Sequence, residues 1–209
     1  MKSRILTLLT AMTLSAALVG VLLGCAEFAP ASTDFVVPPG RDSSPYSIVV
    51  GPDKNLWFTE IGGEKVGRIT TSGVIKQFPI PKAQSLIGIA SGPDGNLWFT
   101  DQLTGKVGHI STAGKDIKEF ELPKGSFPQG ITAGPDGNLW FVDQKQNGLF
   151  EIGKITVSGT ITEYPTNVNV GTFQADPAVG GNYGVIAAGP DGIYGLSIHR
   201  IWLLRRSGK

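Results

Sequence analysis

Residue types that carry acid–base or metal chemistry are sparse in this sequence. It contains two histidines, His109 and His199, which lie on unrelated segments and make a poor metal set. Acidic residues recur three times just after a Trp-Phe pair, as Glu60, Asp101 and Asp143. A repeated carboxylate can line a channel mouth and bind a cation, but it more often satisfies neighbouring backbone, Arg or Lys groups. These residues therefore identify no catalytic group and no metal ligand.

The single cysteine, Cys25, follows a segment unlike the rest of the chain. Lys2 and Arg4 precede an apolar stretch, Ile5–Leu23, which predicts a secretory signal over residues 1–24. The run Leu22-Leu23-Gly24-Cys25 resembles the lipobox of bacterial lipoproteins. This resemblance implies cleavage before Cys25, attachment of a lipid to its thiol, and an exported protein anchored to the membrane outside the cytoplasm. The alternative is an uncleaved transmembrane anchor, because the apolar stretch is about 19 residues long.

Composition excludes several classes of function. The 209 residues include 18 Lys and Arg and 17 Asp and Glu with no run of like charge, so a nucleic-acid partner is not expected. The 29 Gly and 14 Pro favour many tight turns between short strands, which indicates an all-β fold. One cysteine allows no disulfide framework. Residues 25–41 contain several prolines and no periodic pattern, so we expect a tether there.

The strongest signal is an internal repeat. The run Gly-Pro-Asp-Gly-Asn-Leu-Trp-Phe begins at Gly92 and at Gly134, and it begins at Gly51 with Lys in place of the second Gly. A fourth Gly-Pro-Asp-Gly begins at Gly189. Units of about 42 residues that hold four short strands are typical of β-propeller blades. We therefore expect an incomplete propeller of about three to four blades over residues 42–192.

Each unit contains the same sequence of expected elements. The predicted first strands are Ser47–Val50, Gly88–Ser91, Gly130–Ala133 and Gly184–Ala188, each followed by the Gly-Pro-Asp turn and a Leu-Trp-Phe strand. The predicted third strands are Lys65–Thr70, Lys106–Ser111 and Gly153–Val157, and the fourth are Val74–Phe78, Ile117–Leu122 and Thr160–Tyr164, ending near Pro79, Pro123 and Pro165. One indole at the same place in every unit (Trp57, Trp98, Trp140) predicts packing between blades rather than chemistry. The turn residues Asp53, Asp94 and Asp136 are expected to cap their own backbone rather than bind calcium or phosphate.

These units resemble the streptogramin B lyase (virginiamycin B lyase) family. The resemblance rests on the runs Gly51–Glu60, Lys65–Thr70 and Thr71–Pro79 and extends over about Pro45 to Gly192. It implies a seven-bladed propeller that opens a cyclic depsipeptide antibiotic by elimination, without water. It also implies Mg²⁺ to stabilise the enolate-like charge, with a His base and the metal-binding residues on late blades.

The resemblance carries one site residue onto this chain. In the family a His often follows the Pro of a first strand, but here that position holds Tyr46, Ile87, Gln129 and Tyr183. Tyr46 matches a first-blade Tyr in the family's substrate cleft, so the resemblance implies that it contacts the substrate. The alternative is a Tyr packed at the channel rim. No residue is assigned to catalysis, and Mg²⁺ is implied by the resemblance alone. His109 stands where the first unit has Arg68, and a position that accepts Arg, His or Lys predicts a solvated face.

The sequence departs from the repeat after Gly192. Asn-Leu-Trp-Phe is expected there, but the chain reads Ile193-Tyr194-Gly195-Leu196-Ser197-Ile198. Codons exist for these six residues that spell Asn-Leu-Trp-Phe-Val-Asp in the neighbouring frame, the same run as Asn138–Asp143. We therefore expect residues 193–209 to be translated out of frame, which the codons of the gene would test.

Three functions remain open at this point. The first is an incomplete streptogramin B lyase-like propeller. The resemblance implies that full-length relatives open a cyclic depsipeptide lactone by Mg²⁺-assisted elimination, and we expect this chain to lack that activity because the late catalytic blades are not in the sequence. The second is a non-catalytic, surface-anchored propeller that binds a protein or a glycan. The third is a propeller of the sugar-lactone hydrolase type, whose metal residues find no match here. A short array also leaves blade faces and edges uncovered, so we expect low solubility or association through these faces.

Overall fold

The computed structural model describes residues 34–38, 44–62, 64–169, 185–189, 192–197 and 200–205. The chain divides into two units, Met1–Val36 and Val37–Lys209, and every described strand belongs to the second. The described part is all-β, as the sequence predicts, and within it no helix is long and apolar enough to cross a membrane. Because the signal segment, Cys25 and most of the tether fall outside these ranges, the structure does not address their predicted roles.

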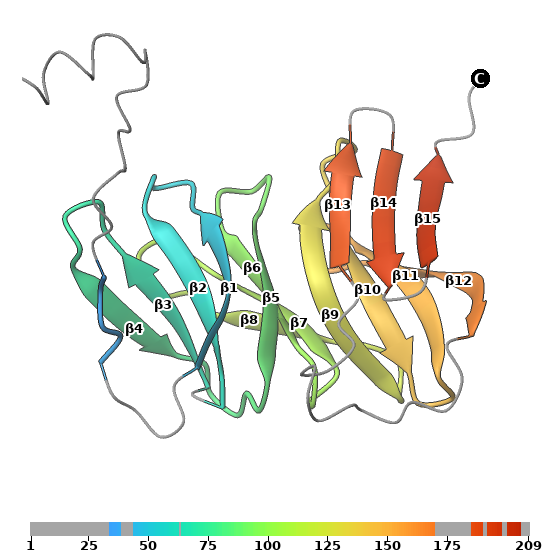
Figure 1. Ribbon diagram of the computed structural model, residues 1–209, viewed down its shortest axis with the longest axis horizontal. Coiled ribbons are helices and arrows are strands. Elements are labelled where there is room, and N and C mark those ends of the chain that lie inside the picture. The colour runs from blue at the N-terminus through green and yellow to red at the C-terminus, as the bar shows by residue number, and fades with distance from the viewer. Residues whose placement is uncertain are drawn as a thin grey trace, which may run out of the picture. The chain divides into compact units, whose positions relative to one another are not determined.

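Three antiparallel sheets of four strands follow one another along the chain, and Figure 1 shows their strands in chain order. The first sheet contains β1 (Ser44–Val50), β2 (Leu56–Ile61), β3 (Lys65–Ile69) and β4 (Ile75–Pro79). The second contains β5 (Leu86–Ser91), β6 (Leu97–Asp101), β7 (Lys106–Ile110) and β8 (Lys118–Glu121). The third contains β9 (Ser126–Ala133), β10 (Leu139–Lys145), β11 (Leu149–Ile155) and β12 (Ile161–Asn169). Three whole blades are thus confirmed.

The fourth sheet has three described strands, β13 (Val185–Gly189), β14 (Gly192–Ser197) and β15 (Arg200–Arg205). Its first hairpin closes with Gly189 opposite Gly192, whereas Val50 pairs with Leu56 and Ser91 with Leu97 in the first two sheets. The connection is therefore shorter than in the repeat, and the change of register begins where the sequence pattern is lost. The first strand still keeps its place in the repeat.

Several strand boundaries differ from the sequence prediction. The strands β1 and β9 begin at Ser44 and Ser126, three and four residues before the predicted Ser47 and Gly130, and two further differences lie in the third sheet. Pro165 does not end the last strand of the third sheet, because β12 continues to Asn169. Pro165 pairs with Glu151 beside a register shift in the ladder between β11 and β12. The third strand of that sheet begins at Leu149, four residues before the predicted Gly153. A proline at such an irregularity loses no ladder hydrogen bond, so the strand can pass through it.

The core lies between successive sheets. One face of each sheet carries the Trp and is here called the Trp face. It packs against the opposite face of the next sheet, here called the Ile face, which is made by an Ile of the first strand, the Leu and Phe of the second and an Ile of the third. Between the first two sheets, Trp57, Val66 and Phe78 meet Ile89 and Leu97, together with Phe99 and Ile110. The second and third sheets repeat this cluster, and Ile186 of β13 covers Trp140 in the same way.

The indoles occupy equivalent places, as the repeat predicts. Trp57 pairs with Val49 and Arg68 in the ladder, and Trp98 and Trp140 hold the matching register positions in their sheets. Each indole stacks on the aromatic ring of its own fourth strand, with centroids 5.4 to 5.7 Å apart. The Gly of each third strand makes room for the Phe beside the Trp, since a Cβ on Gly108 would lie 2.6 Å from the Phe99 ring.

Candidate functional site

The first strands of successive sheets lie side by side. Contacts join β1 to β5, β5 to β9 and β9 to β13, so these four strands form a continuous row, here called the first-strand row (Figure 1). In each of the three whole sheets the first strand carries a β-bulge, where two of its residues face one residue of the second strand. The bulged pairs are Tyr46-Ser47, Ile87-Gly88 and Gln129-Gly130. Bulges redirect side chains, and they occur often beside functional sites.

The bulges contain the residues that the sequence analysis compared. Tyr46 is 43% exposed, whereas Ile87 is 2% exposed and the equivalent Gln129 is fully buried. The side-chain amide of Gln129 donates a hydrogen bond to the side-chain oxygen of Gln144 at 2.7 Å. Among the bulged side chains of the described residues, Tyr46 therefore offers the accessible surface for a ligand. Tyr183 lies outside the described residues.

A buried threonine faces two of the three bulges. Thr59 is fully buried, accepts a hydrogen bond from the Ser47 amide at 3.2 Å and donates to the Ile87 carbonyl at 2.8 Å. Thr100 repeats the pattern one sheet later, between the Gly88 amide at 2.9 Å and the Gln129 carbonyl at 2.5 Å. These threonines were not predicted from the sequence, although the repeated Trp-Phe-Thr run and its change to Trp-Phe-Val in the third unit could have indicated them.

The repeated carboxylates are structural, in agreement with the favoured interpretation. Glu60, Asp101 and Asp143 are fully buried. Asp101 accepts hydrogen bonds from the Ser85 and Gln84 amides at 2.9 and 3.1 Å, and Asp143 accepts one from the Phe127 amide at 2.8 Å. Glu60 accepts one from the Gln77 side chain at 2.8 Å. These acids hold the segments that flank the strands and are committed to neighbours within their own sheets.

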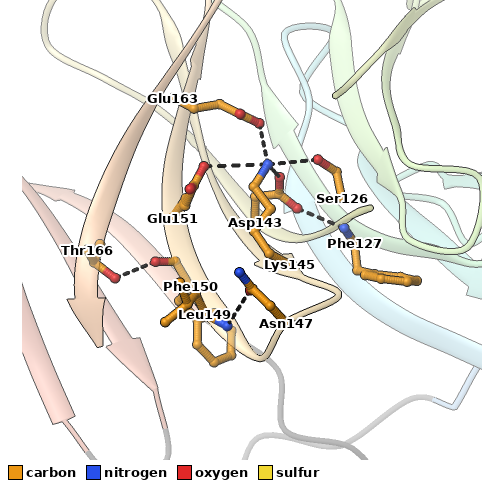
Figure 2. A network of polar contacts seen from close by, with 10 residues as sticks. All are labelled: Ser126, Phe127, Asp143, Lys145, Asn147, Leu149, Phe150, Glu151, Glu163 and Thr166. Carbon is orange, nitrogen blue, oxygen red and sulfur yellow. Dashed lines mark hydrogen bonds and ion pairs between the residues drawn. The ribbon is translucent and has the colours of Figure 1, made fainter. Parts of the chain in front are cut away.

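The third sheet surrounds one ammonium group with acids (Figure 2). Lys145 Nζ lies 2.6 Å from Asp143, 2.7 Å from Glu163 and 3.5 Å from Glu151, and it donates to the Ser126 hydroxyl at 2.9 Å. Burial would lower the pKa of Lys145, but the hydrogen bonds that it donates to Asp143 and Glu163 overcome this effect and raise the pKa. Because the partners come from β9, β10, β11 and β12, this lysine fastens all four strands of the sheet. No sequence pattern predicted the cluster, because it occurs in one unit only.

The turn aspartates hold the indoles in place. Asp53, Asp94 and Asp136 each accept the indole N–H of the Trp four residues later, at 2.9, 3.0 and 2.9 Å. Each also accepts bonds from the Asn two residues on, so the predicted local capping is confirmed and extended to the Trp. Burial would raise the pKa of Asp94, but the bonds from Trp98 and Asn96 outweigh it, and the pKa is lowered. The same balance lowers the pKa of the other two.

His109 was predicted to lie on a solvated face, but the structure packs it against two aromatic rings. Its ring packs at a tilt against Trp98 and Phe120, with centroids 4.9 and 6.1 Å away, and the matching Arg68 lies over Trp57 at 5.5 Å. Burial is the main cause that lowers the pKa of His109. The position therefore accepts Arg, His or Lys because each packs its side chain on the indole.

A Mg²⁺ site of the kind that the resemblance implies does not fit the described residues. No group of three or more His, Cys, Asp or Glu side chains that could hold a metal occurs within the ranges that the structure describes. The acids that do gather, around Lys145, already neutralise an ammonium group. His199 lies outside the described residues. We therefore derive no chemical step through a metal ion from this part of the chain.

Comparisons with known proteins agree with the repeat and the sheets. A family model described as the virginiamycin B lyase family matches residues 23–175. The structure of virginiamycin B lyase from Staphylococcus aureus is 33% identical, with a TM-score of 0.65, and the match covers 85% of this chain and 60% of that one. A streptogramin B lyase structure is 30% identical, with a TM-score of 0.64, and the match covers 85% and 59%.

The description of a third relative names a ligand. It is a catalytically inactive variant of the Staphylococcus aureus virginiamycin B lyase with quinupristin, 34% identical, with a TM-score of 0.65. The match covers 83% of this chain and 59% of that one. No curated protein matched the chain. The chain thus spans about 60% of the length of these relatives.

The successive four-stranded sheets, joined through equivalent Trp faces, define an incomplete β-propeller. This chain belongs to the virginiamycin B lyase family, whose model matches residues 23–175, well over half of its length.

Proposed function

We propose that this chain binds a cyclic peptide antibiotic of the streptogramin B type at the first-strand row and does not open it. The carrying observation is the relative with quinupristin, which is 34% identical over 83% of this chain. The exposed Tyr46 on the bulge of β1 supplies an aromatic face and a hydroxyl within residues 23–175, the part of the chain that the family model matches. An aromatic ring with one polar group suits a ligand built from both apolar and amide surface.

We propose that the chain does not open the antibiotic because the residues at the bulged positions cannot act as the base. Elimination needs a base that takes a proton next to a carbonyl, and a group that stabilises the resulting negative charge. At the bulged positions this chain has Tyr46, Ile87 and Gln129, none of which is a base near neutral pH. The buried acids are held by neighbouring amides or by Lys145. Binding is accordingly proposed to be independent of Mg²⁺.

The test is calorimetric titration of the full chain with quinupristin. Wild type should bind saturably, Tyr46→Phe should keep most of the affinity, and Tyr46→Ala should weaken it about tenfold or more, because a central aromatic contact is lost. Addition of EDTA should leave the affinity unchanged. Val157→Ala, which shortens an exposed side chain in a turn of the third sheet, is the control. No binding by wild type, or equal binding by Tyr46→Ala, would contradict the proposal.

We also propose that the protein is exported and carries lipid on Cys25. The lipobox-like run before Cys25 supports this, and lipidation there would display the propeller at the membrane face, as the surface-binder alternative requires. In a bacterial host, wild type should incorporate labelled palmitate and partition into the detergent phase, whereas Cys25→Ser should do neither. A variant that still takes up the label would contradict lipidation at this cysteine.

A further inference from the structure

The bulge that carries Tyr46 is held from behind by one side chain. Tyr46 and Ser47 together face Thr59, because Pro45 pairs with Glu60 and Ile48 pairs with Phe58. A bulge breaks the ladder, so its amides need other partners. The fully buried Thr59 hydroxyl supplies one, since it accepts from the Ser47 amide at 3.2 Å.

The same hydroxyl ties the bulge to the next sheet. Thr59 donates its proton to the Ile87 carbonyl at 2.8 Å, and Ile87 is the equivalent bulged residue of β5. One oxygen therefore fixes the backbone beside Tyr46 against the neighbouring strand of the first-strand row. A hydroxyl can do both, because it carries one donor and two acceptor lone pairs.

The fold does not need this hydroxyl in every sheet. The third sheet has Val142 at the matching position, fully buried, opposite the bulge that contains Gln129. Valine matches threonine in shape but can neither accept nor donate. The chain itself thus shows that the sheet and its bulge form with valine there, so the fold does not by itself require the hydroxyl of Thr59.

We propose that Thr59 is a positioning residue for the ligand site, which holds the β1 bulge so that the Tyr46 ring is set for the ligand. This inference rests on the proposed function. Thr59 is buried and touches no ligand itself, and it acts through the backbone next to Tyr46.

Three variants of the full chain test the role. Thr59→Val removes the hydroxyl and keeps the shape, Thr59→Ser keeps the hydroxyl, and Thr100→Val removes the matching hydroxyl one sheet away from Tyr46. Quinupristin affinity should fall about three- to tenfold in Thr59→Val, as expected for a lost neutral hydrogen bond, and should stay within about twofold of wild type in Thr59→Ser. The fall in Thr100→Val should be smaller than in Thr59→Val, because Thr100 bonds the bulge of β5 and not that of β1. Melting temperatures should fall equally in Thr59→Val and Thr100→Val, since both hydroxyls are fully buried.

Hydrogen exchange of the Ser47 amide, measured by NMR, separates this inference from the proposed function. Exchange should be faster in Thr59→Val and unchanged in Thr59→Ser and Thr100→Val. Unchanged exchange in Thr59→Val, or an affinity loss as large in Thr100→Val, overturns the positioning role. If wild type fails to bind quinupristin, the proposed function fails, and the exchange of Ser47 still shows whether Thr59 holds the bulge.

Discussion

Single carboxylates in the turns determine where the indoles lie. The Gly-Pro-Asp turn directs its carboxylate oxygen to the N–H of the Trp four residues later, in all three whole units. A buried indole needs a partner for its N–H, and the turn provides one from the same hairpin. The repeat could be recognised in the sequence for this reason: the turn and the Trp recur together in this chain because one binds the other.

Asp94→Ala should destabilise the chain by about 1 kcal/mol, because the Trp98 N–H loses its acceptor. The pKa of Asp94 is lowered in the folded state, so its contribution is present above the unfolded pKa and is lost as pH falls through the folded pKa. Urea unfolding should therefore show a gap between wild type and variant at neutral pH that closes in strong acid. A gap of constant size across this range would contradict the role of the carboxylate, and Asp34→Ala, at an exposed aspartate outside the sheets, is the control.

At the scale of the single sheet, the residue that binds the buried acid differs from one sheet to the next. Lys145 gathers Asp143, Glu151 and Glu163, whereas the second sheet pairs Lys106 with Glu119 at 3.3 Å and the first bonds Gln77 to Glu60. The buried acid recurs in the sequence, but its partner does not. The buried acid and its structural role could therefore be predicted from the sequence, whereas the role of Lys145 as its partner could not.

Lys145→Met should destabilise the chain by about 3 kcal/mol, since Asp143 is fully buried and would lose its cation. Lys106→Met is the matched control, and its cost should stay near 1 kcal/mol, because that pair is partly exposed. The pKa of Lys145 is raised, so its contribution is present below the unfolded pKa and is lost as pH rises through the folded pKa. Equal losses for the two variants at neutral pH would contradict the assigned role.

For the strands themselves, the sequence predicted more than it did for the site. The recurring Gly-Pro-Asp turns and the repeated Trp indicated all twelve strands of the three whole sheets, because each sheet obeys the same local rules. It misplaced the starts of β1, β9 and β11 and the end of β12, where ladder pairing rather than turn residues sets the boundary. The bulges and their threonines depend on register between strands, which a single sequence does not reveal.

At the scale of the whole array, the Ile face of the first sheet differs from the others. Ile48 is 61% exposed and Leu56 is 40% exposed, whereas the equivalent Ile89 and Leu97 are 5% and 0% exposed. Among the described residues, no sheet covers this face as the first and second sheets cover the next ones. Apolar faces of this kind favour association.

Ile48→Lys should reduce self-association of the full chain, because it places a charge in the centre of this face. Sedimentation velocity should show a concentration-dependent larger species for wild type and less of it for the variant. Val157→Lys carries the same change at another exposed apolar residue and should behave like wild type. A monomeric wild type over the accessible concentration range would contradict the expected association.

Equilibrium dialysis of the full chain against quinupristin, followed by mass spectrometry of the ligand on both sides, tests the central proposal most directly. The ligand should accumulate on the protein side and be recovered as the intact cyclic peptide. The full-length Staphylococcus aureus lyase, run in parallel, should yield a linear isomer of unchanged mass, as expected for an elimination. Equal ligand on both sides, or the linear isomer formed by this chain, would contradict binding without turnover.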